Sequence, residues 1–200
     1  FEPTLPAPQA MDMQAWWQHD WVTLPARRNE FDDDQRWPLD VQVAGPLAPL
    51  QAQLEARGWK RQEQAGWQQA LLMLDKNTGA DELPVLPATL DTRVEALLMV
   101  RQGAQPDERY VLRLWPAGAQ LQPGSTPLWL GSAQTLRYER HFEWIGMWHP
   151  LRGVDPALNA VKDAVQDLPQ REDVHSETGL PVLRLKTTTP RPAPARSHPL

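Results

Sequence analysis

The apolar positions in the first half of the chain recur three or four residues apart, which is the spacing of an amphipathic helix. This pattern predicts a helix over residues 46–58, and Gly58 ends it because glycine adopts the left-handed conformation that closes many helices. Its apolar face consists of Leu47, Leu50 and Leu54. The same spacing predicts a second helix that contains Trp67 and stops at residues 77–79.

From residue 93 the period changes from 3.6 to two, which indicates strands. The strand candidates are residues 39–44, 93–102, 109–118, 127–140, 142–150 and 180–187. Two further helices are predicted, one before the first of these strands and one before the last. Asp12 begins a short helix that carries three tryptophans and ends before Pro25, and Asp155 begins a helix over residues 156–168.

The order of these elements is strand, two helices, a strand meander, helix and strand. It predicts an α+β fold in which a mostly antiparallel sheet carries its helices on one face. We expect one domain over residues 12–186. Residues 1–11 are expected to be a Pro-rich linker, and residues 187–200 a disordered Pro-rich tail.

The strand "RYVLRLWPAG" places an arginine beside a tryptophan in an otherwise apolar run. If the registers align, one face of the sheet carries the core residues Val94, Ala96, Leu98, Val100, Leu112, Leu114, Leu128 and Leu130. The opposite face then carries Arg93, Glu95, Arg113, Trp115, Trp129 and Arg137. Arginine clamps phosphate through two N–H groups and tryptophan stacks on rings, so this face is a candidate binding surface.

The candidate binding residues are Arg93, Arg113, Trp115, Trp129 and Arg137. A structural interpretation of the same face stays open. In that interpretation Trp115 and Trp129 form a cross-strand pair, and Glu95 neutralises Arg113 or Arg93.

The composition limits the chemistry. The formal net charge of −5 is spread without a basic stripe, so we expect no nucleic-acid partner. The chain has no Cys, which excludes disulfides and thiolate catalysis. None of its five His stands in a zinc-binding pair, and there is no nucleophile-elbow or phosphate-loop motif. We therefore predict no catalytic residue, metal or cofactor, although residues 32–34 are three aspartates that suit a hard cation or, alternatively, a solvated turn.

The segments "RVEALLMVRQ", "RYVLRLWPAG" and "TPLWLGS", with "PLDVQVAG", "LEARGW" and "LPVLP" upstream, resemble the LssY C-terminal domain family over residues 16–185. The resemblance implies the soluble end of a bacterial membrane protein that also carries a DedA-type domain, a PAP2-type lipid-phosphate phosphatase domain, or both. The phosphatase motifs K-x6-R-P, P-S-G-H and S-R-x5-H-x3-D do not occur here, so that step is assigned to the membrane part. The family supplies no catalytic residues to carry over, and Val111 and Leu112 stand where some members have histidine.

We therefore expect a non-catalytic accessory domain, whose partners are the membrane domain of the same parent chain and an anionic lipid headgroup, an isoprenoid-phosphate carrier or another protein. Two alternatives are a stand-alone hydrolase of an anionic lipid or glycan, and a purely structural assembly module. The chain begins with Phe1 rather than Met, so we expect a piece of a longer protein. Because the chain has no Cys and residues 1–11 are a Pro-rich linker, we expect the domain in the periplasm, with the cytoplasm as the alternative.

Overall fold

A computed structural model describes residues 7–29, 36–63, 89–90, 93–141, 145–150 and 156–188. Its elements are β1 (Gln9–Asp12), α1 (Met13–Gln18), the 3-10 helix η1 (Asp20–Thr23), β2 (Arg27–Asn29), β3 (Arg36–Pro38), β4 (Val41–Ala44), α2 (Leu47–Ala56), β5 (Lys60–Arg61), β6 (Thr89–Leu90), β7 (Arg93–Val94), β8 (Leu97–Gln102), β9 (Glu108–Gln122), β10 (Thr126–His141), β11 (Ile145–Pro150), α4 (Pro156–Ala164), β12 (Gln170–Val174) and β13 (Pro181–Lys186).

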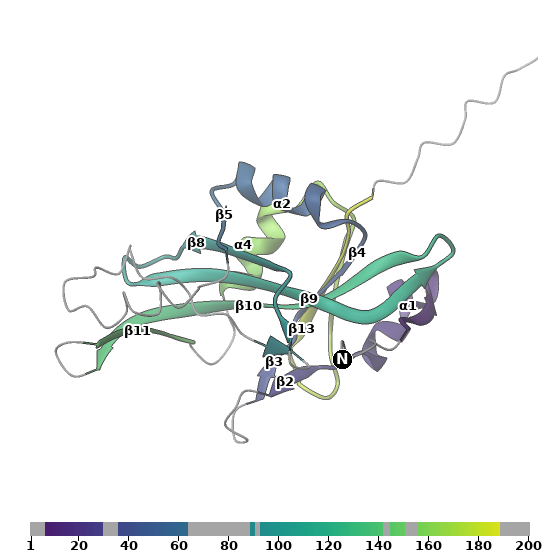
Figure 1. The fold of residues 1–200 in the computed structure, drawn as a ribbon, viewed down its shortest axis with the longest axis horizontal. Helices are drawn as coiled ribbons and strands as arrows, with labels where there is room; N and C mark the ends of the chain where they lie inside the picture. The colour runs from purple at the N-terminus through teal and green to yellow at the C-terminus, as the bar shows by residue number, and fades with distance from the viewer. Residues whose placement is uncertain are drawn as a thin grey trace, which may run out of the picture.

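Most of these strands form one nine-stranded sheet in the order β12-β13-β4-β10-β9-β8-β5. Two further strands attach to its long members, with β1 on β9 and β11 on β10. Most neighbours are antiparallel, but β13 runs parallel to β4 and β1 runs parallel to β9. The sheet is therefore mixed, and segments from both ends of the described chain take part in it (Figure 1).

The centre of the sheet is the long hairpin of β9 and β10, which crosses the molecule in Figure 1. Its strands extend the predictions for residues 109–118 and 127–140 in both directions. Every side chain from Tyr110 to Trp115 is buried, so β9 is covered on both faces. The prediction of one core face and one polar face for this strand was wrong, because a strand in the middle of a covered sheet buries both sides.

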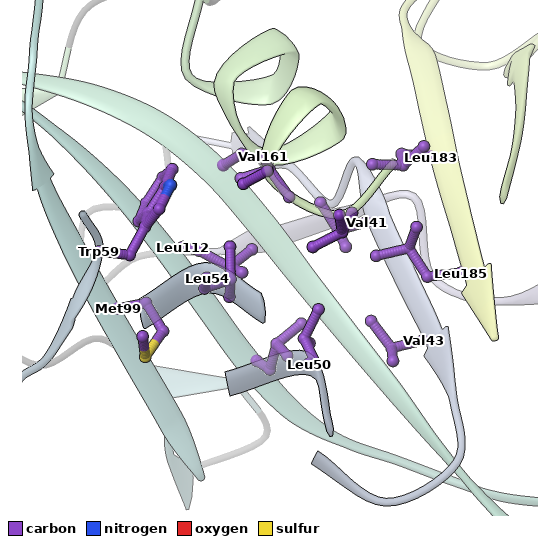
Figure 2. Close-up of a cluster of buried hydrophobic side chains, with 14 of the residues drawn as sticks. Val41, Val43, Leu50, Leu54, Trp59, Met99, Leu112, Val161, Leu183 and Leu185 are labelled. Carbon is purple, nitrogen blue, oxygen red and sulfur yellow. The ribbon is translucent and has the colours of Figure 1, made fainter. Parts of the chain in front are cut away.

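The first face of the sheet, defined by Leu112 and Leu114, packs against α2 and α4. Figure 2 shows Leu50 and Leu54 of α2 and Val161 of α4 close to this face. The strand residues that contribute to this cluster include Val41, Val43, Leu97, Met99, Leu183 and Leu185. The helical spacing of residues 47–54 therefore matches the buried side of α2, as the sequence predicted.

The second face, defined by Trp115 and Leu130, packs against α1 and η1. Trp16 and Trp21 are the buried side chains of these two short helices, and β2 adds Arg28 above Trp115. Helices therefore lie on both faces, and the described part of the chain is predominantly β rather than α+β with helices on one side. The physical reason is that both faces of β9 and β10 carry large apolar side chains, Leu112 and Leu114 on one and Trp115 and Leu130 on the other, so each needs a cover.

Several predicted elements differ in their bounds. Asp12 caps α1 as expected, since its carboxylate accepts from the Ala15 N–H at 2.9 Å, but the helix ends at Gln18. The predicted second helix up to residue 79 lies outside the described residues. Strand β1 takes in Gln9–Asp12, of which residues 9–11 were assigned to the linker. No helix within the described ranges is long and apolar enough to cross a bilayer.

Gly131 of β10 stands opposite Leu114 of β9, and its tight surroundings yield a prediction. A Cβ at this position would overlap the Arg113 carbonyl oxygen and the Leu114 side chain. Gly131→Ala is therefore expected to destabilise the protein by about 1–3 kcal/mol, because a backbone oxygen cannot move aside as a flexible side chain can. Urea unfolding followed by circular dichroism measures the loss.

The matched control is Ser132→Ala, one residue further along the same strand. The Ser132 hydroxyl is buried and, among the described residues, has no hydrogen-bond partner. Its removal is expected to leave the free energy of unfolding unchanged or to raise it. Equal stability of Gly131→Ala and the parent protein would contradict the close approach of the two strands.

Candidate functional site

The structure separates the five predicted binding residues instead of gathering them on one face. Directly opposite residues of an antiparallel pair share a face, and Trp115 stands opposite Leu130 while Trp129 stands opposite Pro116. Trp115 and Trp129 therefore point to opposite sides, and the Trp129 indole donates to the Gly45 carbonyl at 2.9 Å. The predicted cross-strand tryptophan pair was wrong, because a one-residue change of register reverses every side chain.

Arg113 forms a buried ion pair on the second face. Its Nη1 lies 3.1 Å from Glu95 Oε1, and the two side chains are 7% and 0% exposed. This confirms the structural interpretation in which Glu95 neutralises Arg113. Leu98 stands opposite Arg113, so the prediction that Leu98 shares the face of Leu112 was also wrong.

The remaining predicted residues lie elsewhere. Arg137 is opposite Glu108 on the first face and contacts its carboxylate at 3.0 Å. Arg93 lies in β7, opposite Leu90. Trp115 is buried beneath Arg28, whose guanidinium carbon is 5.6 Å from a ring centroid of the indole. The five residues therefore do not form a continuous surface.

The second face instead holds a cluster of aromatic and cationic side chains around Arg184 of β13. Arg184 is fully buried, and its Nη2 donates to Asp173 Oδ2 at 2.7 Å. Its Nε donates to the Trp17 carbonyl at 3.1 Å, and its guanidinium lies 4.5 Å from a ring centroid of Trp21. Arg184 thereby connects the C-terminal hairpin β12–β13 to the N-terminal helices.

Burial is the largest influence on Arg184 and lowers its pKa, while the hydrogen bond and charge of Asp173 oppose that change. The positive charge of Arg171 adds to the lowering. Among the described residues, Arg184 Nη1 is buried and has no hydrogen-bond partner. The positive charge of the Arg184 guanidinium is therefore only partly compensated.

Two polar side chains complete the attachment of the N-terminal helices. Gln42 of β4 accepts from Trp16 Nε1 at 2.9 Å and donates to the Trp21 carbonyl at 3.1 Å. His175 accepts the Glu177 N–H at Nδ1, so its Nε2 carries the proton that points to the Val22 carbonyl at 3.3 Å. The Trp21 indole lies edge-on to His175, and the Arg184 guanidinium lies over the Trp21 ring.

Three cations, Arg184 among them, share one face of β12 and β13, and we name this group the cationic edge. It consists of Arg171, Arg184 and Lys186, together with Asp173 and the Trp17 ring. Arg171 stands directly opposite Arg184, and its Nη2 lies 3.9 Å from Asp173. One carboxylate thus serves two guanidinium groups.

Lys186 has a different environment from the two arginines. Its ammonium lies 4.4 Å from a ring centroid of Trp17, and burial lowers its pKa. Within the part of the chain that the structure describes, no carboxylate lies within 4.0 Å of this ammonium. The cationic edge therefore carries more positive charge than its carboxylate balances, in a chain whose net charge is negative.

The cationic edge was missed at the level of sequence, where residues 180–187 were interpreted only as a final strand. A signal was present, because Arg184 and Lys186 are two residues apart in an apolar run and must share a face. Strand β12 gave no comparable signal. Its residues Gln170–Val174 are mostly exposed and charged, without apolar alternation.

No group of three or more metal-ligating side chains occurs among the described residues. The three aspartates at 32–34 lie outside those residues, so the solvated turn and its alternative, a hard-cation site, are both left as predictions. In the described part, the carboxylates of the sheet's second face are engaged by arginines or backbone. Glu95 contacts Arg113, Asp173 contacts Arg184, and Asp40 accepts from the Ala133 N–H.

Fold and cluster together define a largely β domain with one mixed sheet and a cationic, aromatic edge. The sequence model described as the LssY C-terminus matches residues 21–176, which is most of the chain. The chain belongs to this family, as the sequence resemblance indicated. No curated protein and no solved structure matches the sequence.

Proposed function

We propose that this chain is a non-catalytic accessory domain of a membrane-bound lipid-phosphate phosphatase of the PAP2 or DedA type, and that it recognises an anionic partner. The observation that carries the proposal is the cationic edge, where Asp173 is shared by Arg171 and Arg184, and no carboxylate of the described residues lies within 4.0 Å of the Lys186 ammonium. Anionic lipid headgroups and isoprenoid-phosphate carriers present the complementary charge.

Membership of the LssY C-terminus family supports an accessory role, because the family resemblance associates this domain with membrane proteins that act on lipid phosphates. The chain itself lacks the three phosphatase motifs, which supports a chemical step in the membrane part of the parent protein. A periplasmic location is part of this proposal, since it places the domain beside the outer leaflet of the inner membrane.

The test removes residues 12–186 from the full-length protein and measures the hydrolysis of lipid phosphates in native membranes. Replacement by an unrelated folded domain of similar size is the control for spacing, and immunoblotting checks that both proteins accumulate equally. A fall in turnover, specific to the deletion of this domain, is expected. Unchanged turnover for every lipid phosphate tested, or a full-length protein without a membrane part, would overturn the proposal.

A further inference from the structure

We propose that the cationic edge is a binding site for a phosphate-type oxyanion, held between Lys186 and Arg171 beside the Trp17 ring. This site deepens the proposed function and rests on it for the source of the anion, which is a lipid headgroup. The binding itself is a property of this chain and can be measured without the membrane protein.

The first argument is the uneven balance of charge. Lys186 is desolvated enough to lower its pKa, and among the described residues it has no carboxylate neighbour. Its contact with the Trp17 ring compensates this charge only in part, since cation–π contacts at partly exposed positions are weak. An oxyanion in hydrogen-bonding distance of Nζ would supply the missing countercharge.

The second argument is the register of the two strands. Arg171 stands opposite Arg184, and Lys186 lies two residues beyond Arg184 on the same face. Arg171 and Lys186 are therefore diagonal neighbours, about 7–8 Å apart in such a pair. Long side chains from that spacing can reach a single tetrahedral anion from two sides.

The third argument is that Arg171 can exchange its partner. Its contact with Asp173 is 3.9 Å long, and the two side chains are 41% and 46% exposed, so this pair contributes little to stability. Asp173 would remain fixed by the shorter bond to the buried Arg184. Arg184 thus acts as a positioning residue, which holds Asp173 and the Trp17 carbonyl in place.

The experiment measures binding of the 200-residue chain to two probes at low ionic strength. The first probe is inorganic phosphate, followed by calorimetry. The second is phosphatidylcholine vesicles with and without phosphatidic acid, followed by co-sedimentation. We expect binding to vesicles that contain phosphatidic acid, and no binding to phosphatidylcholine alone.

Lys186→Gln and Arg171→Gln are each expected to weaken binding roughly tenfold, which corresponds to the loss of one charge-assisted hydrogen bond. The matched control is Lys162→Gln, which removes the same charge from the opposite side of the hairpin, where Lys162 pairs with Glu172. It is expected to change binding less than twofold. Circular dichroism verifies that each variant is folded.

The outcomes separate the site from the proposed function. Equal weakening by Lys186→Gln and Lys162→Gln would show unspecific attraction and overturn the site, as would the absence of binding to both probes. Binding of inorganic phosphate without vesicle binding would replace the lipid headgroup by a soluble anion and overturn the lipid source. Normal binding by both site variants, together with a defect on deletion of the domain, would overturn the site and leave the accessory function standing.

Discussion

Glu95→Leu is expected to lower the free energy of unfolding by about 3–5 kcal/mol, because it removes the carboxylate from a buried ion pair and leaves the Arg113 guanidinium in the interior. The 3.1 Å contact links the segment before β8 to the central strand β9, and both side chains are almost fully shielded from water. Urea denaturation followed by far-ultraviolet circular dichroism measures the effect.

The double variant Glu95→Leu with Arg113→Met separates the ion pair from the packing of the site. Replacing both charges by apolar side chains is expected to recover most of the lost stability, since neither charge is then buried alone. A single variant that loses less than about 1 kcal/mol, or a double variant no more stable than the single one, would contradict a strong coupling between the two residues.

Trp16→Ala is the second change with a large expected effect, again about 3–5 kcal/mol. Trp16 is completely buried in the second core cluster, and it is the only buried side chain of α1. The change removes a large apolar surface and also leaves the Gln42 Oε1 acceptor without its indole donor. Thermal and urea unfolding are followed by circular dichroism, because the substitution itself removes one of the tryptophans that give the fluorescence signal.

Two neighbouring changes serve as controls for Trp16. Trp16→Phe keeps an aromatic ring but loses the N–H, so it is expected to cost about 1–3 kcal/mol. Trp17→Ala removes the adjacent indole, which is only half-buried, and is expected to cost less than Trp16→Ala. If Trp16→Ala were as stable as the parent protein, α1 would not belong to the cooperative unit of the domain.

The periodicity of the sequence predicted where the main strands and helices lie. The leucines of α2, the cap at Asp12 and the position of strand β9 are local features, and each was confirmed within a few residues. The order of the strands in the sheet depends on contacts between distant segments. The pairing of β13 with β4, which joins Leu183 to Val41, has no counterpart in local periodicity.

The register between β9 and β10 was predicted wrongly from the sequence. Leu130 stands directly opposite Trp115, so Leu128 and Leu130 lie on the same side as Trp115 rather than with Leu112 and Leu114. The alternation is visible in sequence, but which set of side chains shares a face with a given partner is decided by the register that the turn sets. The predicted arginine and tryptophan surface depended on that choice.

The cationic edge shows the same limit of prediction from sequence, here for a site that the sequence did not reveal. The sequence assigned Arg184 only to a final strand, yet the fold covers it with Trp17 and Trp21 from the opposite end of the described chain. Only the tertiary arrangement shows that Asp173 is its partner and that Lys186 has none among the described carboxylates. Burial and compensation of charge are properties of the folded chain.

The parallel pairing of β4 with β13 has a consequence for how the domain is synthesised. Strand β4 leaves the ribosome early, but the strand that covers its second edge is among the last described residues to be made. Pairings across such sequence separations form slowly, and an uncovered strand edge is prone to join other chains. We therefore expect nascent chains of this protein to be prone to aggregation until β13 has emerged and paired with β4.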